Sequence, residues 1–330
     1  MMGSTFSRFW DQTYFIPKPT FTEKDLPDQT GKVHLITGGY AGLGADLARL
    51  LYSRNATIYI AGRNPSKAAT AIDAIKAVYP DSKGRLEFLK LELDDFRTIA
   101  PAVAEFLAKE ERLDVLVNNA GVMSSPKEAR GKQGHNLQIA TNVLGPFLLT
   151  SLLMPLLQKT AATSPTASVR VVWAASSALD LTAPNGGVPF DAAGAPLTDF
   201  RPETLYGLTK AADVILSKEV ARKWGDSGVM SLAFHPGNLK TELGRHTHLF
   251  GKLLMTLISH PSILGAYTEL FAGWSPTVTP DKNGAYIIPW GRFGDYNKAL
   301  ADAIENDAGG KLWTWCEAET KAYVGQAYVG

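Results

Sequence analysis

Short runs of β-branched and apolar residues alternate with segments of helical periodicity along most of this chain. We predict strands at residues 33–37, 57–60, 86–91, 115–117, 169–173 and 229–234. Between the strands, apolar residues recur every three or four positions, which predicts helices at 43–51, 68–78, 133–157 and 206–224. A repeated strand–helix–strand order is typical of a parallel sheet with helices on both faces.

The same alternation favours one domain over two. A chain of 330 residues could hold two domains of ordinary size, but no composition shift or linker divides it. We therefore predict a single α/β domain over residues 31–330, built on a doubly wound parallel sheet of the Rossmann type. Residues 1–30 are interpreted as an irregular N-terminal leader, and residues at about 240–265 as an inserted helical lid over the substrate.

Charge and cysteine content exclude several classes of protein. Lysine and arginine number 33 against 32 acidic residues, so no long-range field attracts a nucleic acid. The leader lacks the continuous apolar segment of a secretory signal or a membrane span. A single cysteine, Cys316, cannot form an intrachain disulfide. We expect a cytoplasmic protein that contacts neither nucleic acid nor membrane, and a homo-oligomer stays open.

One histidine-rich segment could be mistaken for a metal site. His246 and His248 lie near Glu242, but residues two positions apart do not share a helix face. No third histidine or cysteine ligand is evident nearby, so we predict no metal.

A glycine-rich segment, Thr37-Gly38-Gly39-Tyr40-Ala41-Gly42-Leu43-Gly44, joins the first predicted strand to the first helix. Glycines leave no Cβ in the way of a pyrophosphate, and the helix that follows offers free N–H groups to it. A glycine-rich turn alone would be weak evidence. Its place in the first strand–helix–strand unit predicts a dinucleotide site formed by Gly38, Gly42, Leu43 and Gly44.

The end of the second strand bears on which dinucleotide binds. An NAD site has an acidic residue about 20 residues after the glycines. This chain has Arg63 at that place, with Lys67 close behind. Two cations can pair with a 2′-phosphate, which favours NADP. The alternative is that both are solvated charges at the start of a helix.

Tyr206 and Lys210 lie four residues apart on one face of a predicted helix. A free tyrosine has a pKa near 10, but a neighbouring ammonium and an oxidised nicotinamide both stabilise the phenolate. Tyr206 could then act as an acid and base near neutral pH. The spacing alone also occurs in ordinary surface pairs.

Three further features surround this pair in the predicted topology. Ser176 and Ser177 follow the fifth strand, where a hydroxyl can hydrogen-bond a substrate carbonyl. Residues 119–121 follow the fourth strand, where small residues let a ribose approach. Asn142 is polar in an otherwise apolar helix, so it is either solvent-facing, backbone-bonded, or the holder of a water in a proton relay.

Taken in order, these motifs resemble those of the short-chain dehydrogenases/reductases of the compact TGxxxGxG type. The resemblance covers roughly residues 30–245. Arg63, the long substrate loop and the C-terminal tail resemble the branch of retinol-dehydrogenase-like and fungal reductases. The motifs that carry it are TGGYAGLG, NNAG, Asn142, Ser176-Ser177, YGLTK and HPGNLKT, the last at 235–241.

The resemblance implies hydride transfer between NADP and a carbonyl or an alcohol. It assigns Tyr206 as general acid/base, Lys210 as its partner and ribose ligand, and Asn142 as the end of the relay. Ala175 replaces the family's first serine, so the strand register assigns substrate orientation to Ser176, with Ser177 as the alternative. The implied cofactor contacts also include Glu92 in place of an aspartate, Leu93, Asn119, Ala120, Gly121, Pro236, Gly237, Leu239 and Thr241.

The substrate is expected to be a hydrophobic carbonyl or alcohol of medium size. The expected lid is rich in apolar residues between Leu249 and Ile258, and Met123 and the loop at 181–204 lie near the predicted site. The apolar stretch could equally pack on the core. A second function class is a catalytically inactive NADP-sensing regulatory protein, against which the intact Tyr206–Lys210 pair argues.

Overall fold

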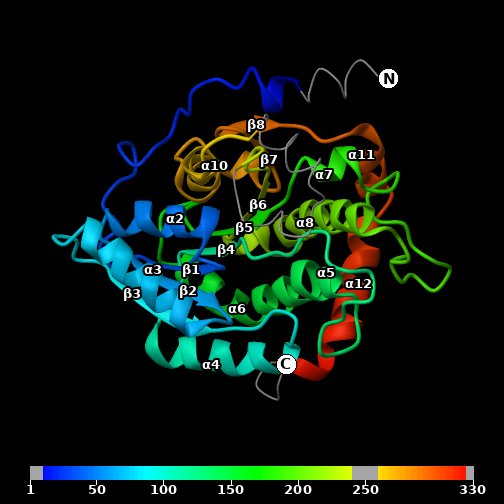
Figure 1. Ribbon diagram of the computed structural model, residues 1–330, viewed down its shortest axis with the longest axis horizontal. Helices are drawn as coiled ribbons and strands as arrows, with labels where there is room; N and C mark the ends of the chain where they lie inside the picture. Colours follow the sequence, from blue (N-terminus) through cyan, green and yellow to red (C-terminus); the bar gives the residue numbers. More distant parts are fainter. Residues whose placement is uncertain (1–9, 240–258, 325–330) are drawn as a thin grey trace.

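The computed structural model describes residues 10–239 and 259–324. Its centre is an eight-stranded sheet of order β3-β2-β1-β4-β5-β6-β7-β8 (Figure 1). Only β8 runs antiparallel to its neighbour, at the edge of the sheet. The predicted doubly wound α/β domain is confirmed, with this one antiparallel strand added. The strands are β1 Val33–Thr37, β2 Thr57–Gly62, β3 Arg85–Lys90, β4 Val115–Asn118, β5 Arg170–Ala174, β6 Met230–Phe234, β7 Tyr286–Ile288 and β8 Arg292–Gly294.

The order of the strands determines where a ligand can bind. β1 pairs with β2 on one side and with β4 on the other, so the direction of winding reverses between β1 and β4. Loops that leave the carboxyl ends of these two strands therefore diverge to opposite faces of the sheet. The gap between them is the usual ligand crevice of open parallel sheets.

Helices cover both faces of the sheet (Figure 1). On one face α2 (Gly42–Tyr52), α3 (Pro65–Val78) and α10 (Ser262–Trp274) enclose an apolar core with the sheet. On the other face lie α4 (Ile99–Lys109), α6 (Gly145–Ala161) and α8 (Pro202–Trp224). Near the C-terminus, α11 (Lys298–Glu305) precedes α12 (Ala308–Thr320), which packs across α6 and α8.

The helix predicted at 133–157 begins later and ends later in the structure. Gly134 has a φ of +89°, and the Asn136 side chain accepts the N–H of Gln138, so the first turn begins at Leu137. α5 (Leu137–Ile139) continues through the π-turn η2 (Ala140–Leu144) into α6. Residues 137–161 are long and apolar enough to cross a membrane, but 83% of their most apolar window is buried inside the protein. This helix therefore belongs to the core of the domain.

Among the described residues, the sequence did not predict the helices α4, α7 (Ala178–Leu181), α10 and α11. In α4 the buried residues Ile99, Ala102, Val103 and Phe106 have the spacing of an amphipathic helix, so the signal was present.

The described part of the leader packs on the domain. Phe21 and Leu26 are buried in the same apolar core as α2 and α10. Residues 240–258 of the expected lid lie outside the described residues, together with its apolar stretch. Residues from Ser262 onward begin α10, which packs against α2. Residues 262–265 of the expected lid therefore form the first turn of α10.

Candidate active site

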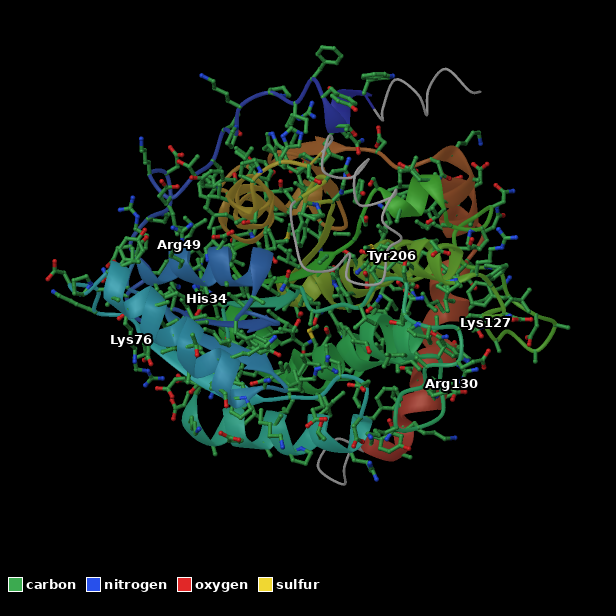
Figure 2. The ribbon with its side chains drawn as sticks, viewed as in Figure 1. His34, Arg49, Lys76, Lys127, Arg130 and Tyr206 are labelled. Atoms are coloured by element: carbon green, nitrogen blue, oxygen red, sulfur yellow. The ribbon has the colours of Figure 1, made fainter. Side chains whose placement is uncertain are left out.

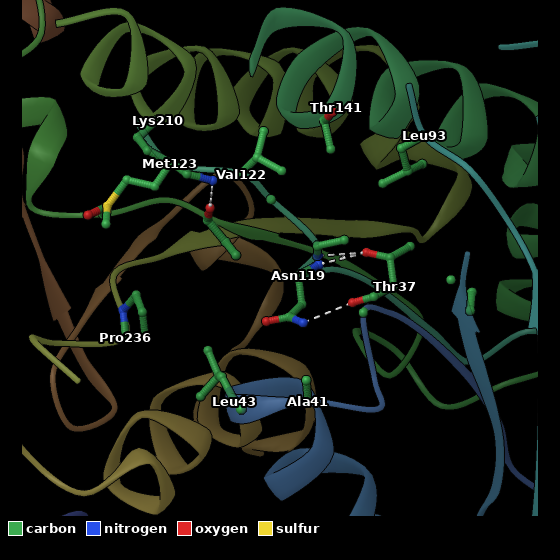
Figure 3. Close-up of a pocket in the computed structure, with 18 of the residues that line it drawn as sticks. Thr37, Ala41, Leu43, Leu93, Asn119, Val122, Met123, Thr141, Lys210 and Pro236 are labelled. Atoms are coloured by element: carbon green, nitrogen blue, oxygen red, sulfur yellow. Dashed lines mark hydrogen bonds between the residues drawn. The ribbon is translucent and has the colours of Figure 1, made fainter. Parts of the chain in front are cut away.

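A cavity of about 330 Å³ lies at the carboxyl ends of the strands, between the loops that follow β1 to β6 (Figure 3). It brings together residues that are far apart in the sequence. Thr241 lies outside the described residues, and Gly44, Lys67 and Asn142 do not line the cavity. The expected site residues that do line it are Gly38, Gly42, Leu43, Arg63, Glu92, Leu93, Asn119, Ala120, Gly121, Ser176, Tyr206, Lys210, Pro236, Gly237 and Leu239.

The glycine-rich loop has the geometry of a phosphate cradle. Gly42 has a φ of +51°, a conformation that glycine adopts without strain. Gly44 lets the start of α2 lie close to the Asn119 side chain, because a Cβ at this position would lie 2.6 Å from the side-chain amide nitrogen of Asn119. No side chain caps α2 at Ala41, so the N–H groups of the first turn are free to bind an anion. These features fit the pyrophosphate of a dinucleotide.

Thr37 joins the two strands that flank the crevice. Its Oγ1 accepts the N–H groups of Asn119 at 3.0 Å and Ala120 at 2.9 Å, and donates to the carbonyl of Val117. The Asn119 amide donates to the Thr37 carbonyl at 2.8 Å (Figure 3). The loop after β4 is therefore held in the middle of the cavity.

The far end of the cavity contains an aromatic residue that sequence reasoning missed. Tyr40 lies directly on Gly62 at the end of β2, where a Cβ would come within 2.3 Å of its ring. Arg63 follows and lines the cavity. Lys67 is exposed on α3, where its N–H donates to the Asn64 side chain. Of the two expected phosphate ligands, only Arg63 lines the cavity.

Tyr206 lies in the second turn of α8, near the middle of the molecule (Figure 2). The Lys210 Nζ atom is 5.6 Å from the centroid of its ring. The ammonium donates to the Ala174 carbonyl at 2.7 Å and to Asp213 Oδ2 at 2.9 Å. Tyrosine, lysine and the end of β5 thus meet in one place.

The lysine and its carboxylate partner are both buried. Burial acts to lower the pKa of Lys210, but the charge of Asp213, the charge of Tyr206 and the hydrogen bond to Asp213 together raise it above its ordinary value. Burial raises the pKa of Asp213 to about 6, against the attraction of Lys210. At neutral pH the two therefore form a buried ion pair.

The two serines after β5 differ in position. Ser176 lines the cavity, and its Oγ accepts the N–H of Ala178 at 3.2 Å. Ser177 does not line it, and its N–H donates to Nδ1 of the buried His235. Burial lowers the pKa of His235 to about 3, so the ring is neutral and Nδ1 accepts. The geometry favours Ser176 as the residue that meets a ligand.

Asn142 lies in the π-turn and is buried. Its Oδ1 accepts the N–H of Val122 at 2.8 Å, and its Nδ2 donates to the Val122 carbonyl and to Thr209 Oγ1. A Cβ on Gly121 would lie 3.3 Å from Asn142 Oδ1 and 3.6 Å from Lys210 Nζ. The amide thus holds the loop after β4 against α8, next to the lysine.

The family model for short chain dehydrogenases matches residues 32–249. A short-chain dehydrogenase/reductase from Phomopsis amygdali is 42% identical to this chain, and the alignment covers 98% of this chain and 100% of that protein. A second short-chain dehydrogenase/reductase, from Pestalotiopsis fici, is 41% identical, and the alignment covers 97% of this chain and 100% of that protein. The chain belongs to the short-chain dehydrogenase/reductase family. The sequence-based assignment to this family and to its fungal members is confirmed.

Solved structures share the fold of this short-chain dehydrogenase/reductase. An uncharacterized protein from Mycobacterium paratuberculosis aligns with a TM-score of 0.65 and 27% identity, over 91% of this chain and 97% of that chain. The NADPH-bound carbonyl reductase from chicken fatty liver aligns with a TM-score of 0.57 and 20% identity, over 78% and 96%. Enzymes of this family are oxidoreductases that use nicotinamide cofactors.

Two residues of this short-chain dehydrogenase/reductase, Tyr40 and Asp213, were missed from sequence, and so was the hydrogen bond from Ser177 to His235. Asp213 had a visible signal, since it is a lone acid among apolar residues of a buried helix. Within residues 10–239 and 259–324, no three histidine, cysteine, aspartate or glutamate side chains are grouped as a metal site requires. The segment with His246 and His248 lies outside those residues.

Proposed function

We propose that this chain is an NADP-dependent oxidoreductase that transfers a hydride between NADP(H) and a hydrophobic carbonyl or alcohol. The supporting observation is that Ser176, Tyr206 and Lys210 line the same cavity as the uncapped N-terminus of α2. One end of the cavity fits the phosphates of a dinucleotide, and the other end carries a hydroxyl, a phenol and an ammonium. A small-molecule substrate in the cytoplasm, without nucleic acid or membrane, agrees with this chemistry.

The bound nicotinamide supplies or accepts the hydride. In the direction of reduction, Ser176 donates a hydrogen bond that orients the substrate carbonyl. Tyr206 donates its proton to the carbonyl oxygen as negative charge develops there, and it takes the proton back in oxidation. The Lys210 ammonium favours the phenolate and binds the ribose hydroxyls. Asn142 completes the relay from its place beside Gly121 and Lys210.

Cofactor preference rests on Arg63, which occupies the position of the acidic residue in NAD sites. NADPH should bind at least tenfold more tightly than NADH, or about 1.4 kcal/mol. Fluorescence titration measures both dissociation constants. Arg63→Asp should weaken NADPH and improve NADH, whereas Lys67→Ala, outside the cavity, should weaken NADPH less. Equal constants for the two cofactors in the unaltered protein would refute the assignment.

The catalytic assignment is tested by turnover of NADPH with a panel of aromatic and aliphatic carbonyls. Tyr206→Phe should reduce kcat by about 10²–10⁴ while NADPH binding is kept. Ser176→Ala should reduce kcat strongly, and Ser177→Ala weakly. Tight NADPH binding without turnover of any carbonyl or alcohol would instead favour the NADP-sensing protein.

Substrate size is the remaining part of the proposal. Met123 lines the cavity next to Val122, and the cavity walls near Tyr206 include Ala174 and Ala175. These apolar side chains lie in the same cavity as Ser176, Tyr206 and Lys210, so an apolar substrate could contact them while its carbonyl meets the polar groups. Bulky hydrophobic carbonyls should therefore have a lower KM than small polar ones.

A further inference from the structure

Asp213 lies one turn after Lys210 on α8, and both residues are 4% exposed. Its Oδ2 accepts from the Lys210 ammonium at 2.9 Å, but Asp213 itself does not line the cavity. We propose that Asp213 is a positioning residue that aims the Lys210 ammonium into the cavity and keeps it charged over the working pH range. This inference rests on the proposed function of the same site.

Hydrogen-bond counting supports the aiming role. An ammonium has three N–H donors. The Ala174 carbonyl and Asp213 Oδ2 take two of them, one from β5 and one from α8 itself. Lys210 also lines the cavity, so the third donor is left for a ligand there. Without the carboxylate, the long lysine side chain would lose one of its two fixed points.

Charge supports the second role. A buried ammonium without a counter-charge loses its proton more readily. The elements packed against Lys210 present uncharged groups: the Ala174 carbonyl from β5 accepts from its ammonium, and the Asn142 amide from the π-turn lies on the other side of Gly121. Among the described residues, the charges that act on Lys210 are those of Asp213 and Tyr206, and the charge that acts on Asp213 is that of Lys210. Asp213 is therefore the carboxylate that compensates this ammonium.

Two opposite effects follow from replacing the carboxylate by an amide. Asp213 offsets part of the field that the ammonium exerts on Tyr206, so Asp213→Asn should favour the phenolate and extend alcohol oxidation to lower pH. The uncompensated ammonium should also lose its proton at lower pH than before. In the profile of alcohol oxidation against pH, the midpoint on the acid side should therefore move to lower pH, and a new decrease should appear on the alkaline side.

The experiment compares Asp213→Asn with Glu219→Gln. Glu219 is a matched control, because it lies on α8, is 5% exposed and pairs with Arg222 away from the cavity. For Asp213→Asn, the acid midpoint of kcat for alcohol oxidation should fall by about 0.5–1 pH unit. Its NADPH dissociation constant, measured without substrate, should rise about tenfold toward alkaline pH. Both profiles of Glu219→Gln should match those of the unaltered protein.

A third measurement does not depend on activity or cofactor. Lys210→Met and Asp213→Leu should each lower the thermal midpoint, and the double variant should recover most of the loss, because no buried charge is left alone. The proposal is overturned if Asp213→Asn keeps both unaltered pH profiles, or if the double variant loses the sum of the single losses. If no substrate turns over, but the alkaline loss of NADPH affinity and the recovery are both seen, the proposed activity fails and the role of Asp213 stands.

Discussion

Nδ1 of His235 accepts the backbone N–H of Ser177 at 3.2 Å, which links the end of β6 to the loop after β5. The same nitrogen accepts the N–H of Gly237 at 3.3 Å. Ser176 and Gly237 both line the cavity, so this one buried imidazole fixes two segments of the cavity wall relative to each other.

His235→Leu should lower kcat by about 10–100-fold, because small displacements of a positioning hydroxyl are costly to the rate. Asn can present an oxygen near the place of Nδ1, so His235→Asn should recover most of the rate. Steady-state kinetics with a carbonyl substrate measure both variants, and circular dichroism checks that they fold. Unchanged kcat in the leucine variant would show that the two N–H groups do not need this acceptor.

Gly62→Ala should weaken NADPH binding by about tenfold, or about 1.4 kcal/mol. A Cβ at this position would lie 2.3 Å from the Tyr40 ring, so the ring must move into the cavity end that also contains Arg63. Adding Tyr40→Ala should restore part of the affinity. Gly273→Ala is the control, since its Cβ would meet Val115 at 3.6 Å, an ordinary contact far from the loop. Calorimetric titration with NADPH decides the outcome.

Arg170→Met should lower the free energy of unfolding by at least about 3 kcal/mol. The buried guanidinium donates to the carbonyls of Ala167, Ala272 and Ser275, and so joins β5 to the end of α10. Burial lowers its pKa to about 10. Methionine would leave these carbonyls unpaired. Lys109→Met, which removes an ion pair with Glu105 in which both side chains are 47% exposed, should cost less than about 1 kcal/mol in the same urea titration.

Glu269→Met should stabilise the protein, and by more at higher pH. Glu269 is fully buried in α10, and neither carboxyl oxygen has a hydrogen-bond partner among the described residues. Burial raises its pKa well above the ordinary value. The folded state thus keeps a proton that the unfolded chain releases near pH 4.3, and stability falls by about 1.4 kcal/mol per pH unit above that point until the folded group ionises.

Urea titrations across the pH range should show this slope in the unaltered protein and a reduced slope in Glu269→Met. Glu317→Gln, at an exposed position of α12, should leave the slope unchanged. A pH dependence that Glu269→Met does not alter would contradict the assignment of the proton to this carboxyl.

Much of the fold could be predicted because its signals are local. Apolar periodicity within ten or twenty residues identified six of the eight strands and the principal helices. Tyr206 and Lys210 share a helix face by spacing alone. The glycine-rich loop predicted a phosphate site at one end of the cavity, because glycine, which has no Cβ atom, is recognised directly in the sequence.

Sequence patterns predicted the structure less well where an element was short or irregular. β7 and β8 have three residues each, too few to show a clear alternation. The start of the long helix depended on Gly134 and the cap at Asn136, and its π-turn on contacts of Asn142 with Val122 and Thr209. Such details vary by a few residues without changing the apolar pattern.

The succession of strands and helices along the chain, the glycine-rich loop and the spacing of Tyr206 and Lys210 could be predicted from the sequence, because each depends on neighbours within a few residues. The sequence favoured Ser176 over Ser177 by strand register, but it could not show that the N–H of Ser177 donates to a histidine 58 residues away. Nor could spacing show that Lys67 stays outside the cavity, or that Asp213 is the buried partner of Lys210 at 2.9 Å. Burial and pairing of polar groups arise when distant segments exclude water together, so they exist only in the folded molecule.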